Sequence, residues 1–183
     1  MKNSYKTISS EEFKSRYLAI HDSIFTGRLV HQKPFENPNW EIILLPGGIR
    51  FPKDIFLAWE KAALECGDSE VILTDCDQTV DTTHNDTILM TWDYQNIKDI
   101  YLSDSFVGVL DTNIFGQSGS WGIICYSKDD FSCIGGPPSF IDNFSSPLGG
   151  RKGLKENFYD FMLQGWFIDE KMKLEILKSV GWQ

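Results

Sequence analysis

Basic residues are scarce in this chain of 183 residues, which has 17 lysines and arginines against 26 aspartates and glutamates, for a net charge of -9. A protein that binds the phosphate backbone of nucleic acid needs a basic face, so the balance argues against a nucleic-acid partner. The same shortage argues against a polybasic protein that lies on anionic membranes. The excess acid instead favours a basic protein as partner.

Long apolar runs and cysteine clusters are also missing. The longest strongly apolar run, Ile42 to Leu45, is far too short to cross a bilayer, and no signal-peptide-like stretch follows residues 1–6. The four cysteines form no C-x-x-C pair, and no histidine is placed to complete a zinc site with them. We therefore expect a cytoplasmic protein with reduced thiols, although the sequence does not exclude two disulfides.

The acidic residues are concentrated in the middle of the chain. Residues 67–150 contain thirteen acids, twelve of them aspartate, against only Lys98 and Lys128. Residues 1–66 contain nine basic and eight acidic residues, and residues 151–183 contain six and five. The net charge is therefore -11 in the middle segment and +1 on each side of it, which points to the middle segment as the functional one.

Helical patterns occur mainly toward the two ends. Apolar residues at helical spacing predict helices over 10–25, from Pro52 to Gly67, over 153–165 and from Asp169 to Gly181. A short helix is expected after the glycine–proline turn at 135–138.

Runs rich in aliphatic and aromatic residues predict strands over 40–45, 71–74, 87–92, 106–110 and 121–126. Because no helix of useful length is evident between 70 and 126, these runs favour a largely antiparallel meander with terminal helices packed on it. The expected class is α+β. We expect a single domain over 1–183, with an acidic central sheet region at 67–150 and a C-terminal helical segment at 154–183 that docks on the sheet.

One motif carries candidate catalytic residues. The apolar run from Val71 ends in Asp75-Cys76-Asp77-Gln78-Thr79, which resembles the first motif, D-x-D-x-T, of the haloacid dehalogenase superfamily. The resemblance implies a phosphohydrolase with Asp75 as nucleophile and Asp77 as general acid/base. It also implies a magnesium ion held by Asp75 with Asp129 and Asp130, and phosphate contacts from Thr91 and Lys98.

Two features depart from that family. Gln78 stands where glycine is usual, and the residues behind the motif predict strands and turns instead of alternating strands and helices. An Asp-rich turn leaving a strand is the structural alternative. The segment 75–86 also loosely imitates a calcium loop, but Val80 and Asp86 occupy the positions where an EF-hand needs glycine and glutamate. A weak cation site there is a further alternative.

The middle segment also mixes aromatic residues with aspartates, the composition expected of a face that binds a basic protein. The candidate partner-binding residues are Trp92, Asp93, Tyr94, Asp99, Tyr101, Asp104 and Asp111. A solvated Asp-rich surface over an aromatic core is the alternative.

The run from Ser120 to Gly136 and the small, acidic character of the chain resemble bacterial toxin-immunity proteins. The resemblance implies a cytoplasmic, non-enzymatic inhibitor that neutralises a basic, nuclease-type toxin, without a cofactor, nucleic acid or membrane. This is the leading hypothesis. The alternative is the magnesium-dependent phosphohydrolase that uses Asp75 and Asp77.

Overall fold

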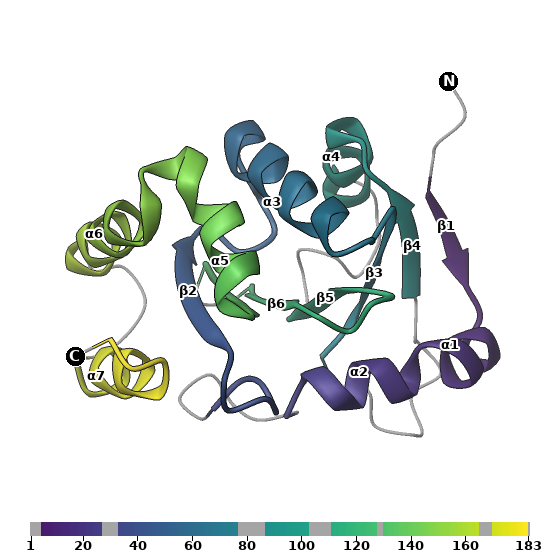
Figure 1. The fold of residues 1–183 in the computed structure, drawn as a ribbon, viewed down its shortest axis with the longest axis horizontal. Coiled ribbons are helices and arrows are strands. Elements are labelled where there is room, and N and C mark those ends of the chain that lie inside the picture. Colours follow the sequence, from purple (N-terminus) through teal and green to yellow (C-terminus); the bar gives the residue numbers. More distant parts are fainter. Residues whose placement is uncertain are drawn as a thin grey trace.

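A seven-stranded antiparallel sheet lies at the centre of the molecule (Figure 1). The computed structural model describes residues 5–26, 33–76, 87–102, 111–127, 130–164 and 170–182. The strands are β1 (Tyr5–Ile8), β2 (Glu41–Pro46), β3 (Glu70–Asp75), β4 (Thr87–Thr91), β5 (Thr112–Gly116), β6 (Gly122–Tyr126) and β7 (Phe131–Gly136). Their order is β1-β4-β3-β5-β6-β7-β2, so the two earliest strands form the two edges. The structure confirms the α+β class.

Helices cover both faces of this sheet. The described helices are α1 (Ser10–Arg16), α2 (Leu18–Ile24), α3 (Lys53–Glu65), α4 (Tyr94–Leu102), α5 (Pro138–Ser145), α6 (Gly150–Leu163) and α7 (Glu170–Ser179), with a 3-10 turn at Ser146–Leu148. Buried residues of α3, α4 and α5 pack on one face, and those of α1, α2 and α7 pack on the other. Helix α6 contributes Leu154 to the first core and Phe158 and Met162 to the second. No helix of the described residues is both long and apolar enough to cross a membrane.

Alternate residues of the strands point into two separate cores. In β3, Val71 and Leu73 join the core under α3, while Ile72 joins the core on the opposite face. Because successive strand side chains point to opposite faces and both faces are covered, the central strands are apolar at nearly every position. This explains why they stand out in the sequence as continuous apolar runs.

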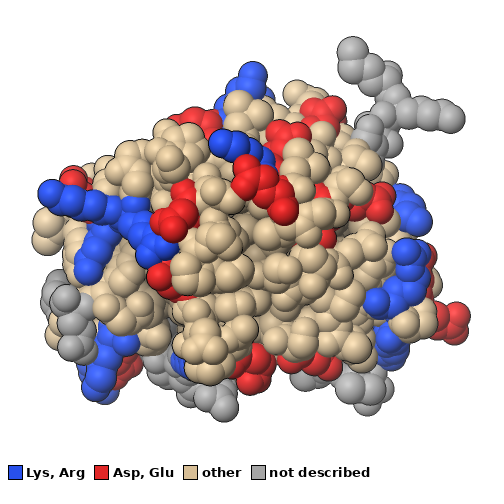
Figure 2. All heavy atoms as spheres, in the orientation of Figure 1, with Lys and Arg blue, Asp and Glu red and all other residues tan. Residues whose placement is uncertain are grey.

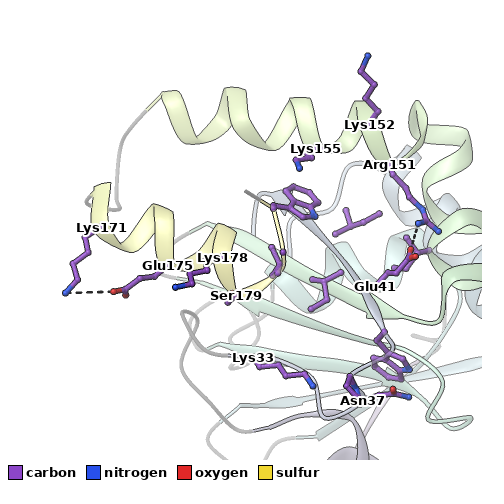
Figure 3. Close-up of a pocket in the computed structure, with 18 residues that line it drawn as sticks. Lys33, Asn37, Glu41, Arg151, Lys152, Lys155, Lys171, Glu175, Lys178 and Ser179 are labelled. Atoms are coloured by element: carbon purple, nitrogen blue, oxygen red, sulfur yellow. Dashed lines mark ion pairs between the residues drawn. The ribbon is translucent and has the colours of Figure 1, made fainter.

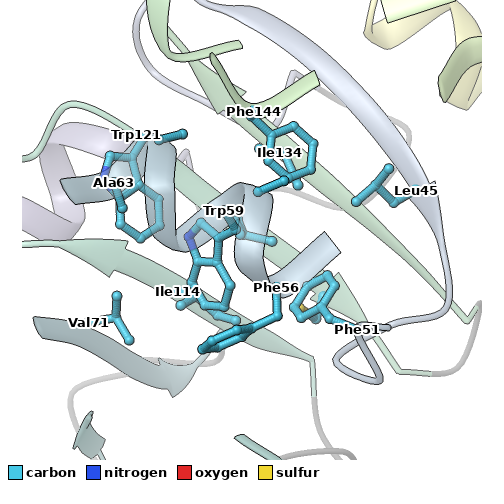
Figure 4. Close-up of a cluster of buried hydrophobic side chains, with 14 of the residues drawn as sticks. Leu45, Phe51, Phe56, Trp59, Ala63, Val71, Ile114, Trp121, Ile134 and Phe144 are labelled. Carbon is cyan, nitrogen blue, oxygen red and sulfur yellow. The ribbon is translucent and has the colours of Figure 1, made fainter. Parts of the chain in front are cut away.

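Aromatic rings dominate the core beneath α3 (Figure 4). Trp59 and Trp121 are fully buried, with ring centroids 5.8 Å apart in an edge-to-face arrangement. Phe140 of α5 stacks flat on Trp121 at 5.6 Å. Trp121, directly before β6, therefore contacts both α3 and α5, in geometries that aromatic pairs favour.

The carboxylate of Asp68 is buried beside these indoles. It accepts hydrogen bonds from the backbone and hydroxyl of Ser118, at 2.8 and 2.7 Å, and from Trp121 Nε1 at 2.8 Å. A Cβ on Gly116 would lie 2.1 Å from an oxygen of this carboxylate, so only glycine fits at the end of β5. The residues between Gly116 and Gly122 thus form the turn that connects β5 and β6.

Some element predictions need correction. The helix expected over 10–25 is two helices, because the backbone leaves helical geometry at Tyr17. The expectation of no helix between 70 and 126 is wrong, since α4 lies there and buries Ile97 and Ile100. β1, β5 and β7 were not predicted, and the strand expected over 106–110 lies outside the described residues.

We predict that Gly122→Ala destabilises the protein. The added Cβ would lie 2.6 Å from Cγ2 of Ile24 and 2.9 Å from the ring of Phe25, both buried. Overpacking of this kind costs about 1–3 kcal/mol of unfolding free energy, measurable by urea denaturation. Gly153→Ala on α6 is the matched control, since its Cβ meets only ordinary contact. Equal stabilities for the two variants would contradict the packing described for Gly122.

Candidate functional site

The predicted partner-binding residues around α4 lie on the same side of the sheet as α3. Trp92 is half-buried, and its Nε1 donates to the backbone carbonyl of Asp68 at 2.8 Å. Its ring lies 4.8 Å from that of Trp59. Tyr94 packs on Phe56, with ring centroids 5.5 Å apart. These aromatic residues are therefore held by the core and present only part of each ring to solvent.

The two carboxylates of this segment point away from the core. Asp93 is exposed and accepts a hydrogen bond from the backbone of Gln95 at 2.8 Å, which fixes the first turn of α4. Asp99 accepts from Gln95 Nε2 at 2.6 Å. Tyr101 is half-buried beneath the guanidinium of Arg50, at 4.8 Å from its ring centre.

Helix α3 adds exposed leucines to these residues. Leu57 is 48% exposed and Leu64 is 50% exposed, and Leu102 at the end of α4 is 75% exposed. We call the outward-facing surface of α3 and α4 the acidic helical face; it comprises Lys53, Asp54, Leu57, Glu60, Lys61, Leu64, Glu65, Asp93, Lys98, Asp99 and Leu102. Figure 2 shows its carboxylates spread across the top of the molecule.

The sequence analysis did not identify Leu57 and Leu64. Their spacing of seven residues was a usable signal, because it places both on one side of a helix. Phe56, Trp59 and Ala63 form the buried side, so the two leucines project from the opposite side.

The remaining predicted aspartates lie elsewhere or outside the described residues. Asp111 is at the end of the sheet where β5 begins, and its Oδ1 accepts from the backbone of Ser127 at 2.8 Å. Asp104 is outside the described residues. Five of the predicted residues thus lie in the one segment that includes α4: Trp92, Asp93, Tyr94, Asp99 and Tyr101. Asp111 occupies a separate position.

The residues proposed for phosphate chemistry are not assembled in the described part of the chain. Asp75 ends β3 and Asp130 precedes β7, with β5 and β6 between them, a separation of about 14 Å from strand spacing. Thr91 pairs with Glu70, at the opposite end of β3 from Asp75. Asp77 and Asp129 lie outside the described residues, and the described ones contain no metal-binding cluster of three or more acidic, histidine or cysteine side chains.

Asp130 has a structural role in the described chain. Its backbone adopts a positive φ of 51°, and its carbonyl accepts from Gly47 at 2.6 Å. Its side chain accepts from Gly48 at 3.3 Å. The antiparallel sheet also differs from the parallel core that a haloacid dehalogenase resemblance implies.

A chain of polar side chains connects α2 to the sheet, and its two central members, His21 and Asn113, are buried. His21 Nδ1 lies 2.9 Å from Asp22 Oδ1, and its Nε2 lies 3.0 Å from Asn113 Nδ2. The thiol of Cys76 donates to the other end of the Asn113 amide at 3.0 Å. Because the amide separates the sulfur from the imidazole, the histidine does not take the thiol proton directly. The chain joins α2 to β5 and to the end of β3.

A large basic cleft opens at the β2 edge of the sheet (Figure 3). Its volume is about 1260 Å³, and its walls come from the segment 33–43, α6 and the C-terminal helix α7. Six basic side chains line it against two carboxylates, Glu41 and Glu175. The basic residues are Lys33, Arg151, Lys152, Lys155, Lys171 and Lys178. Figure 2 shows this clustering of positive charge at the left of the molecule.

Comparisons of the chain with protein-family models, curated proteins and solved structures find no match.

Burial of His21 predicts a loss of stability in acid. Burial lowers the pKa of His21 below its usual 6.5, which outweighs the opposing effect of Asp22. As the pH falls through 6.5, the unfolded chain takes up a proton before the folded protein does. The free energy of unfolding therefore decreases between pH 6.5 and the lower folded pKa, by at most about 1.4 kcal/mol per pH unit.

The variant His21→Gln should show a smaller loss of stability between pH 7.5 and pH 5.5 than the unaltered protein, measured by urea unfolding at each pH. Both proteins share every other titrating group, so the difference isolates His21. The same pH dependence in both would contradict a neutral, buried His21.

Proposed function

We propose that this protein is a non-catalytic inhibitor that acts in the cytoplasm by binding a basic protein, as an immunity protein neutralises a nuclease-type toxin. The observation that carries the proposal is the acidic helical face, where Leu57, Leu64 and Leu102 are exposed among five carboxylates. Exposed apolar side chains surrounded by charge are characteristic of surfaces that bind proteins.

The two kinds of side chain on this face supply different parts of binding. Covering these leucines, which are 48–75% exposed, with a partner removes apolar surface from water and stabilises the complex. The carboxylates of Asp93 and Asp99 attract a cationic partner and raise the rate of encounter. Three lysines, Lys53, Lys61 and Lys98, interrupt the negative charge and would contribute to partner selectivity.

The aromatic residues next to this face favour binding through their rigidity. Trp92 is held by its hydrogen bond to Asp68 and by its contact with Trp59. A ring that is already ordered loses little conformational freedom when a partner covers it. We therefore assign Trp92 and Tyr94 as rigid contact residues next to the charged side chains of the acidic helical face.

A charge-neutralising variant tests the electrostatic part. Asp93→Asn with Asp99→Asn removes two charges while preserving the oxygen that caps α4. The test partner is the most basic protein encoded next to this gene, with binding followed by stopped-flow fluorescence. We expect the association rate to fall about fivefold to tenfold at low salt and to change little at high salt, because salt screens exposed charges.

Glu11→Gln with Glu36→Gln is the matched control, since it makes the same change in net charge at exposed sites away from this face. If the control variant lost association rate equally, total charge would explain the effect. That result would contradict the assignment of the acidic helical face as the binding surface. Magnesium-dependent phosphomonoester hydrolysis that disappears in Asp75→Asn would contradict the non-catalytic proposal itself.

The exposed leucines should control dissociation. Leu57→Ala with Leu64→Ala removes apolar contact without changing charge, so the dissociation rate should rise at least tenfold while the association rate stays within about twofold. Surface plasmon resonance with the same partner measures both rates. Unchanged dissociation would show that the leucines lie outside the interface. Both side chains are about half exposed, so folding should be retained, and thermal denaturation checks this.

A further inference from the structure

The basic cleft at the β2 edge has no role in the function proposed above. We propose that it binds an extended, acidic segment of a partner protein, which lies along β2 between α6 and α7. The cleft and the acidic helical face are built from different elements and carry opposite charge. The protein then has two binding surfaces, one for a basic protein and one for an acidic segment.

Three lysines make the cleft positive. Arg151 is paired with Glu41 and Asp142, and Lys171 with Glu175. In contrast, Lys33, Lys155 and Lys178 come from three different segments, and none forms an ion pair with a described carboxylate. Within the part of the chain that the structure describes, no carboxylate pairs with these three charges around the cleft, which favours a ligand with several separated carboxylates.

The strand β2 offers backbone groups to such a segment. It is the last strand of the sheet and pairs only with β7 among the described strands. In an antiparallel pair, alternate backbone groups of an edge strand point away from the partner and can accept another strand. The residues of β2 that line the cleft are Glu41, Ile42 and Ile43, the half of the strand farthest from Pro46.

The size and the walls of the cleft also fit a peptide. Its volume of about 1260 Å³ exceeds the roughly 300–1,000 Å³ typical of small-molecule pockets. Trp40, Val180 and Trp182 contribute apolar surface between the charged groups. Lys155 lies over the Trp182 ring at 5.5 Å, and the Tyr159 hydroxyl donates to the Trp182 carbonyl at 3.1 Å. These contacts hold the C-terminal wall against α6.

A peptide explains these features better than a nucleic acid does. A polynucleotide carries a negative charge at every phosphate, so parts of it would lie against Glu41, Glu175 and the apolar walls of the cleft. It would also make no use of an unpaired strand edge. A peptide with alternating acidic and apolar residues matches the charge, the apolar walls and the backbone of β2 together.

The proposal is tested with a fluorescein-labelled peptide of twelve residues in which glutamate alternates with valine and threonine. Binding to the whole protein is measured by fluorescence anisotropy at low salt. The variant Lys33→Gln with Lys178→Gln removes two of the cleft's positive charges, one from the segment before β2 and one from α7, and we expect its affinity to fall about tenfold. The control Lys6→Gln with Lys14→Gln makes the same charge change at exposed sites on β1 and α1, outside the cleft, and its affinity should stay within about twofold.

Two further ligands distinguish backbone pairing with β2 from attraction between charges as the source of affinity. The same peptide N-methylated at alternate residues keeps its charge but cannot pair with a strand edge, so its affinity should fall at least fivefold. A twelve-nucleotide single-stranded DNA should bind more weakly than the peptide. Tighter DNA binding, equal losses in the cleft and control variants, or unchanged binding after N-methylation would each overturn the proposal.

A second copy of the chain is the remaining occupant to test. Sedimentation velocity should show that the protein's association state does not depend on the cleft lysines. Self-association that Lys33→Gln with Lys178→Gln abolishes would identify the acidic surface of another copy as the occupant and overturn the proposal. Thermal denaturation of each variant verifies that folding is retained.

Discussion

The side-chain carboxylate of Asp68 accepts three hydrogen bonds inside the protein, two from Ser118 and one from Trp121. The backbone carbonyl of the same residue accepts a fourth from Trp92. A carboxylate removed from water is stable only when such donors replace its hydration. Because burial of Asp68 requires these donors, the turn between β5 and β6 and the indoles of Trp92 and Trp121 are held in one geometry. Trp59 packs against these two indoles, so the position of α3 follows from the same constraint.

The acidic helical face depends on this arrangement. Once Trp59 is fixed against the sheet, the opposite side of α3 must face solvent, and Leu57 and Leu64 lie on that side. Trp92 is held at the start of α4, so Asp93 follows it at the surface. The leucines of the acidic helical face, together with Asp93, are thus positioned by a buried hydrogen-bond network that they do not join, whereas Trp92 belongs to it.

Much of the fold could be predicted from the sequence because the central strands are buried on both faces. β3 and β4 read as continuous apolar runs, and α3 has apolar residues at helical spacing. α4 was missed because only Asn96, Ile97 and Ile100 are buried in it, too few to stand out among its polar residues. β5 was missed because Thr112 and Asn113, both buried in the structure, made its beginning read as a polar turn.

The candidate sites were predictable to different degrees for a related reason. Trp92 to Tyr101 is a local segment, so its aspartates and aromatic residues were visible together. The basic cleft is not local: Lys33, Lys155 and Lys178 are far apart in sequence, and each surrounding segment is nearly neutral. Residues 151–183 have a net charge of only +1, which concealed the fact that their basic side chains gather on one wall. Only the packing of α6 and α7 beside β2 reveals that concentration.

Helix α5 lies between the two surfaces and contacts the elements of both. Asn143 donates to Glu65 at the end of α3, while Asp142 and Glu41 both pair with Arg151 at the start of α6. These groups are at least partly exposed, so the pairs contribute little to stability. The stronger connection is apolar, because Phe140, Ile141 and Phe144 of α5 are buried in the core that α3 shares. Ile141 also lines the basic cleft, so one rigidly packed helix sets the spacing between a surface for a basic protein and a surface for an acidic segment.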